Sequence, residues 1–105
     1  EYTYSINYYS LLCKEFFIEV HMDKRIGVIG IVIEDTSQIA EVNRILHEYS
    51  HIIIGRMGIP YREKGLNVIS IIVDGTNDDI GALSGKLGKI KGLSVKSALS
   101  KNIRR

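Results

Sequence analysis

The stretch 25-RIGVIGIVIEDTSQ-38 decides the fold, because a buried strand, a turn and a helix start follow one another within it. Arg25 to Ile33 is rich in β-branched residues and is apolar at both alternating sets of positions, which predicts a strand covered on both sides. Glu34 to Ser37 then supplies side chains that cap helices. With Asp35 as the N-cap, Gln38 stands at the third helical position, as in a capping box.

The residues that follow extend this pattern of strands and helices. One helix is expected after Ser37 and a second after Gly75, where Thr76, Asn77 or Asp78 can cap it and Gly92 can end it. Pro60 ends the strand formed by Ile52 to Ile59, and proline is tolerated near the end of an edge strand. The expected strands are Ile52 to Ile59, Asn67 to Asp74 and Leu93 to Leu99. The apolar stripes of the two helices are Ile39, Val42, Ile45, Leu46 and Tyr49, then Ile80, Leu83, Leu87 and Ile90.

The resulting order is βαββαβ, which predicts an α+β, ferredoxin-like sandwich with a four-stranded, mainly antiparallel sheet. Right-handed crossovers place both helices on one face of that sheet and leave the second and fourth strands at its edges. The strand 25–33 is nevertheless apolar on the uncovered face, where Val28 and Val32 would lie. An exposed apolar patch of this kind marks an interaction surface. We expect another subunit or residues 1–21 to cover it.

Residues 1–21 differ in composition from the rest of the chain and contain Cys13, the one cysteine. Two interpretations are open. The segment is either an over-extended gene start, with Met22 as the true first residue and the codons of Ile18 to Val20 resembling a ribosome-binding site, or a packing arm. In the second case the apolar face of the arm would be Leu11, Leu12, Phe16 and Val20. The expected division is therefore an N-terminal extension over 1–21 and one domain over 22–105.

Composition excludes several classes of protein. A single cysteine in 105 residues allows no internal disulfide and no cysteine-based zinc site. We therefore expect a reducing, cytoplasmic compartment and no metal or other cofactor. No apolar run approaches the roughly 20 residues of a membrane span, and no signal peptide is evident. A net charge of +2 is too small to argue for nucleic-acid binding.

Two motifs suggest chemistry but fail on spacing. His47 to His51 matches the zinc protease pattern H-E-x-x-H, yet both histidines fall opposite the apolar stripe of the helix, and no histidine follows to complete a site. The SGK triplet at Ser84 resembles a phosphate-binding loop, but the required first glycine is missing and Leu87 replaces the Ser or Thr. We found no nucleophile–base pair and no paired carboxylates, so we do not expect an enzyme.

Two glycine-containing segments leave a functional and a structural interpretation open. Gly85 and Gly88 fall opposite the apolar stripe of the second helix, either by neutral drift or because a partner backbone or a ligand approaches there. Gly55 and Gly58 interrupt a strand, which predicts a bulge. Arg56 between them is then a surface residue or, helped by Arg62, an anion contact at a subunit boundary.

The run from Met22 to Lys101 resembles the iron-only hydrogenase system regulator family, small ACT-like domains related to the C-terminal sensor domain of nickel-responsive repressors. The residues that carry the resemblance are MDKRIGVIGIVIED, VNRIL, IIIGRMGIPY and LSGKLGKIKGLSVKSALSK. The resemblance implies an ACT fold, homo-oligomers and a regulatory role beside hydrogenase maturation. The chain also departs from the nickel-responsive repressors in two respects. The cysteine and histidines that bind nickel in those repressors have no counterpart here, and residues 1–21 are too short for their DNA-binding arm.

ACT-like domains bind small effectors between subunits, near the first strand-to-helix loop. Carried to this chain, the resemblance implies a site formed by Asp35, Thr36 and Ser37 and by the opposing Gly55, Arg56 and Gly58. The three loop residues are equally explained as helix caps. The sequence therefore predicts a sensor domain that binds an unidentified effector in a homo-oligomer, with Val28, Val32, Gly85 and Gly88 at the interface. The alternative is a protein–protein interaction module without a ligand.

Overall fold

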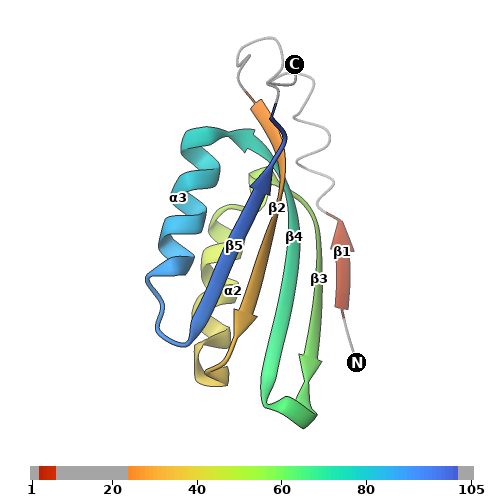
Figure 1. The fold of residues 1–105 in the computed structure, drawn as a ribbon. Coiled ribbons are helices and arrows are strands. Elements are labelled where there is room, and N and C mark those ends of the chain that lie inside the picture. The colour runs from red at the N-terminus through yellow and green to blue at the C-terminus, as the bar shows by residue number, and fades with distance from the viewer. Residues whose placement is uncertain (1–2, 7–23, 102–105) are drawn as a thin grey trace.

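In a computed structural model of the chain, which describes residues 3–6 and 24–101, five strands form one sheet and two α-helices cover one of its faces (Figure 1). The strands are β1 (Thr3–Ile6), β2 (Lys24–Ile33), β3 (Ile53–Tyr61), β4 (Leu66–Thr76) and β5 (Leu93–Leu99). The helices are α2 (Ile39–Glu48) and α3 (Asn77–Gly88), and three short 3₁₀ turns are η1 (Thr36–Gln38), η2 (Ser50–Ile52) and η3 (Arg62–Lys64).

The strand order is β1-β3-β4-β2-β5, and every neighbouring pair is antiparallel. The helices connect β2 to β3 and β4 to β5, which are parallel strands separated by one other strand, so the predicted ferredoxin-like α+β class is confirmed. The strand β5 is an edge of the described sheet, as expected. The expectation that β3 is an edge strand is wrong from Gly55 to Gly58, because β1 pairs with these residues. Pro60 lies beyond them.

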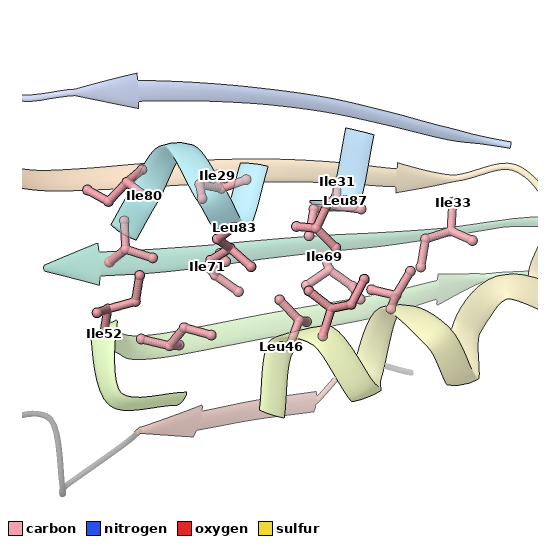
Figure 2. Close-up of a cluster of buried hydrophobic side chains, with 14 residues drawn as sticks. Ile29, Ile31, Ile33, Leu46, Ile52, Ile69, Ile71, Ile80, Leu83 and Leu87 are labelled. Carbon is pink, nitrogen blue, oxygen red and sulfur yellow. The ribbon is translucent and has the colours of Figure 1, made fainter. Parts of the chain in front are cut away.

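The core lies between the sheet and the helices, and its composition confirms the predicted apolar stripes (Figure 2). Ile29, Ile31 and Ile33 alternate along β2 and are fully buried. Their antiparallel neighbours on β4 point the same way, because directly paired residues share a face of the sheet. The helices contribute Val42, Ile45 and Leu46 from α2 and Ile80, Leu83 and Leu87 from α3. Ile39, Tyr49 and Ile90 are partly buried against this core.

Asp35 caps η1 rather than α2, which corrects the predicted helix start. Its carboxylate accepts hydrogen bonds from the backbone N–H and the Oγ hydroxyl of Ser37 at 3.0 and 2.7 Å. The chain therefore turns tightly through η1, and α2 begins only at Ile39. The capping box is also absent, since the backbone N–H of Asp35 donates to the Gly92 carbonyl at 3.3 Å.

The helix α3 begins as predicted and ends earlier. The Thr76 hydroxyl accepts the Asp79 N–H at 3.1 Å, so Thr76 is the cap among the three candidates. Gly88 is the last residue of α3 rather than a mid-helix position, and Gly92 is not its end. Instead, Gly92 has φ = 80° in the turn before β5, and its carbonyl accepts the Glu34 N–H at 2.7 Å. This contact joins the α3–β5 turn to the β2–α2 loop.

The packing arm proposed for Leu11 to Val20 falls outside the residues that the structure describes. The backbone of β1 is described, and its pairs run from Thr3 opposite Gly58 to Ile6 opposite Gly55. Neither the arm nor the over-extended gene start is tested by these residues. The division of the chain at residue 22 thus stays a prediction.

Candidate functional site

The face of the sheet opposite the helices, called the open face below, carries the exposed large apolar side chains of residues 24–101. Six of them are between 37% and 45% exposed, and strand alternation places all six on this face. They come from three neighbouring strands. The six are Val28 on β2, Met57, Ile59 and Tyr61 on β3, and Val68 and Ile72 on β4.

Strand pairing arranges these side chains in rows across the sheet. Val28 pairs with Ile72 at the centre, and each is 45% exposed. A second row contains Ile59, Val68 and the partly buried Val32. The row between them contains Gly30, Ser70 and Met57, so β2 and β4 contribute no large side chain to it. A Cβ built at Gly30 would meet only the Lys96 carbonyl oxygen, at 3.9 Å.

Val28 and Val32 lie on this face, as predicted from the sequence, whereas the residues from β3 and β4 were not predicted. The sequence does contain a pattern that predicts the outward residues of β4. Val68 and Ile72 alternate with the buried Ile69, Ile71 and Val73, which predicts that they point away from the core. What the sequence could not tell is that β3, β4 and β2 are neighbours, so that their outward residues merge into one surface.

The glycines of α3 face away from the core, as predicted. Gly81, Gly85 and Gly88 are exposed, and a Cβ built at any of them meets no atom within 4 Å. The space beside them can therefore accept a partner or simply contain water. Docking at Gly85 and Gly88 stays a prediction.

The predicted loop residues lie together and are exposed: Asp35 caps η1, and Thr36 and Ser37 are its first two residues. Hydrogen bonds from the Ser37 side chain and then from its backbone N–H lower the pKa of the Asp35 carboxyl. Asp35 therefore acts as a cap in this structure. Its carboxylate is ionised at neutral pH and already accepts two hydrogen bonds, so an effector amine would have to share it.

The second set of predicted site residues lies elsewhere in the chain. The register of β3 shifts between Ile53 and Gly55, which confirms the predicted bulge. Gly58 pairs with Ile69, which pairs with Ile31, so it lies two strands away from the strand that leads into the loop. One chain does not bring Gly55, Arg56 and Gly58 to Asp35. A site made of both sets would need a second subunit.

Arg56 lies on the helix-facing side of β3, opposite Ile71 in the register. Its Nη2 group donates a hydrogen bond of 2.8 Å to Oδ1 of Asn43 on α2. Burial lowers the pKa of the Arg56 guanidinium. Arg62 is in η3, beyond the end of β3, so it is not the neighbouring helper that the sequence suggested.

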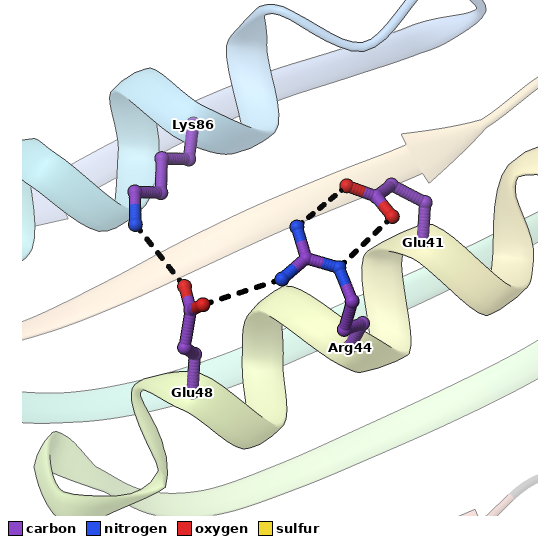
Figure 3. Close-up of polar contacts among 4 residues, drawn as sticks. All are labelled: Glu41, Arg44, Glu48 and Lys86. Carbon is purple, nitrogen blue, oxygen red and sulfur yellow. Dashed lines mark hydrogen bonds and ion pairs between the residues drawn. The ribbon is translucent and has the colours of Figure 1, made fainter.

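A polar network joins the outer surfaces of α2 and α3 (Figure 3). Arg44 binds Glu41 at 2.7 Å and Glu48 at 3.2 Å, and Glu48 also binds Lys86 at 3.1 Å. The Lys86 ammonium lies 5.1 Å from the centre of the Tyr49 ring. Hydrogen bonding to Lys86 lowers the pKa of the Glu48 carboxyl, and bonding to Arg44 lowers that of Glu41.

The same network explains the H-E-x-x-H match. Glu48 is the glutamate of the motif, and its carboxylate is engaged with Arg44 and Lys86. Because α2 ends at Glu48, His51 lies in η2 and is not one helical turn from His47 on a continuous helix. In the described ranges, no three or more His, Cys, Asp or Glu side chains gather as metal ligands do.

An open pocket of about 420 Å³ lies at the N-terminal end of α3. Its lining combines the cationic Lys24 with Asp78 and Asp79, besides His51 and Thr76. This mixture of charges selects no single class of ligand.

No helix in residues 24–101 is long and apolar enough to cross a membrane.

Comparison with protein families gives a match over residues 25–97 to the family described as "TM1266-like: Iron-only hydrogenase system regulator, putative". Among solved structures, the chain is similar to the uncharacterized protein TM1266 from Thermotoga maritima, with 40% identity and a TM-score of 0.71. This similarity covers 74% of the present chain and 99% of the other. A search of curated proteins gave no match.

Proposed function

The chain belongs to the TM1266-like family, as its sequence resemblance predicted, and we propose that it is a regulatory module that assembles with copies of itself and responds to a small effector. The proposal places this module beside an iron-only hydrogenase system, in the cytoplasm. We assign it no enzymatic activity, because the family is described as a regulator.

The observation that carries the proposal is the open face of the sheet. Six large apolar side chains from three adjacent strands form one surface there, and soluble monomers rarely expose so continuous an apolar patch. Fully burying one such side chain contributes about 1.5–3 kcal/mol. Since each is already more than half buried, contact with a second copy would add about 1 kcal/mol per side chain.

The distribution of charge on the open face supports the same proposal. Between Ile26 and Val32 on β2, and between Val68 and Ile72 on β4, the outward residues are uncharged. Lys96 on the edge strand β5 lies at the border of this surface. An uncharged centre with charge at the rim is the usual composition of a protein–protein interface.

A variant of the central row tests self-association directly. We expect light scattering after gel filtration to give the wild type a mass of two chains or more. Ile72→Glu should reduce that mass to one chain, because it places a carboxylate at the centre of the interface. Ala82→Glu is the matched control, since it adds the same charge at an exposed position on α3. A monomeric wild type, or an Ile72→Glu oligomer, would contradict self-association.

The second candidate is a module that docks a different protein through the same face without any ligand. The open face favours it equally, since apolar area does not specify the partner. A thermal-shift screen with amino acids, nucleotides and metal salts separates the two functions. A reproducible rise in melting temperature supports effector sensing. An oligomer that responds to no compound supports the interaction module instead.

A further inference from the structure

Arg56 is a partly buried cation between β3 and α2, on the helix-facing side of the sheet. Its guanidinium is fixed by the 2.8 Å hydrogen bond from Nη2 to Oδ1 of Asn43, a residue thirteen positions earlier in the chain. A guanidinium has five N–H donors in a planar fork that matches a carboxylate. Asn43 is a neutral acceptor, so it does not neutralise the charge.

The carboxylates near α2 are engaged elsewhere. Glu41 and Glu48 both bind Arg44, and Glu48 also binds Lys86 on α3. Asp35 before the helix accepts its hydrogen bonds from Ser37. Within residues 24–101, Arg56 forms no ion pair, and burial is the cause of its lowered pKa. Among the described residues Arg56 is therefore a partly buried cation without a counter-charge, and this is an electrostatic arrangement that an anion relieves.

We propose that Arg56 and Asn43 form the recognition pair for a carboxylate group on the small effector, an inference that rests on the proposed sensing function. Arginine donates but cannot accept hydrogen bonds, so the Asn43 carbonyl oxygen must face it. The Asn43 amide N–H₂ group is then a further donor beside the guanidinium. A carboxylate can accept from both groups at once.

The charge of the site favours a carboxylate over a phosphate group. Arg56 supplies one positive charge in a partly buried position, which one carboxylate neutralises. A phosphate monoester carries about −1.5 to −2 at neutral pH and would leave excess negative charge there. Because Arg56 is on β3 and Asn43 is on α2, a carboxylate bound to both would also connect the sheet to the helix layer.

The test uses the full chain and simple salts as probes. Sodium succinate and sodium acetate are titrated up to tens of millimolar against sodium phosphate and sodium chloride of equal ionic strength, with the melting temperature as readout. We expect the carboxylates to raise the melting temperature and phosphate to raise it less. Arg56→Gln should abolish the carboxylate response, and Arg56→Lys should weaken the apparent affinity for succinate at least tenfold, because it keeps the charge but loses the planar fork.

Asn43→Asp keeps the inference testable if Arg56→Gln does not fold. This variant places a carboxylate beside Arg56, so we expect a higher melting temperature without any added salt and no further response to succinate. Arg44→Gln is the matched control and should respond like the wild type, because Arg44 already has two carboxylate partners. An unresponsive wild type, an equal response to phosphate, or a less stable Asn43→Asp variant would overturn the inference.

These outcomes are distinguishable from a failure of the proposed function. If the wild type is an oligomer that Ile72→Glu dissociates, self-association holds whatever succinate does. If another compound raises the melting temperature of both the wild type and Arg56→Gln, effector sensing holds and only the Arg56–Asn43 site is lost. If the chain is a monomer and no compound stabilises it, the proposed function fails as well.

Discussion

Replacing Gly92 by alanine should cost this domain much of its stability, although Gly92 is neither in the core nor in a helix. Its φ of 80° is left-handed, and a non-glycine residue pays about 1–2 kcal/mol there. The added Cβ would come 2.5 Å from the Asp35 Cβ and 3.3 Å from the Asp35 backbone nitrogen. The turn must therefore shift, which weakens the hydrogen bonds from Glu34 and Asp35 to the Gly92 carbonyl.

The magnitude follows from these contributions. A typical hydrogen bond contributes about 0.5–1.5 kcal/mol net, so strain together with one or two weakened bonds gives a loss of roughly 2–4 kcal/mol. That is a large part of the roughly 5–15 kcal/mol that stabilises a domain. At about 4–8 °C per kcal/mol for a domain of this size, the melting temperature should fall by at least 8 °C.

The matched control makes the same substitution at Gly85. No atom lies within 4 Å of a Cβ built there, and the backbone is helical, so Gly85→Ala should stabilise the domain by up to about 1 kcal/mol. Urea denaturation followed by circular dichroism measures both variants. If Gly92→Ala is as stable as the wild type, or if Gly85→Ala is less stable, the reasoning from local geometry is refuted.

Two further predictions concern the open face and the polar network. Gly30→Ala should raise the free energy of unfolding of the single chain by about 0.5–1 kcal/mol, because the added methyl group has room and glycine is unfavourable in a strand. The same variant should weaken self-association, which a dilution series followed by light scattering measures. If the protein concentration at the midpoint of dissociation is unchanged, Gly30 is excluded from the interface. The second prediction is a pH dependence. Because the folded-state pKa of Glu48 is below its ordinary value of 4.5, its contribution to stability is present at neutral pH and is lost as the pH falls through the folded-state pKa. Glu48→Gln should therefore lower the melting temperature slightly at pH 7 and not once the pH is below the folded-state pKa of Glu48. Since the network is exposed, added salt should shrink the difference at pH 7. A Glu48→Gln variant whose deficit persists at low pH would show that the side chain acts by packing.

Local pattern explains why so much of the fold could be predicted. The alternation of Ile29, Ile31 and Ile33, and the helical spacing of Ile80, Leu83 and Leu87, each follow from the geometry of one element. The cap at Thr76 and the bulge before Gly55 likewise depend on neighbouring residues only. Predictions based on short-range geometry were therefore mostly confirmed.

The candidate site was less predictable, because it depends on contacts between distant residues. Asp35 was expected to cap a helix, but a hydrogen bond from its own backbone to Gly92 helps to hold a 3₁₀ turn there instead. Arg56 was identified as a candidate, yet its partner Asn43 carried no signal of its own in the sequence. Only the packing of α2 on β3 brings these two side chains together.

Within residues 24–101, the sequence by itself determined which segments are strands and helices, their order, and which side of each helix is buried, because the periods of 2 and 3.6 residues belong to single elements. Only the tertiary structure decided that β1 joins the sheet beside β3, that outward residues of β2, β3 and β4 form one apolar surface, and that Gly92 meets Asp35. The physical reason is that strand order and side-chain partners are set by pairing and packing between residues far apart in the chain, which no local period encodes.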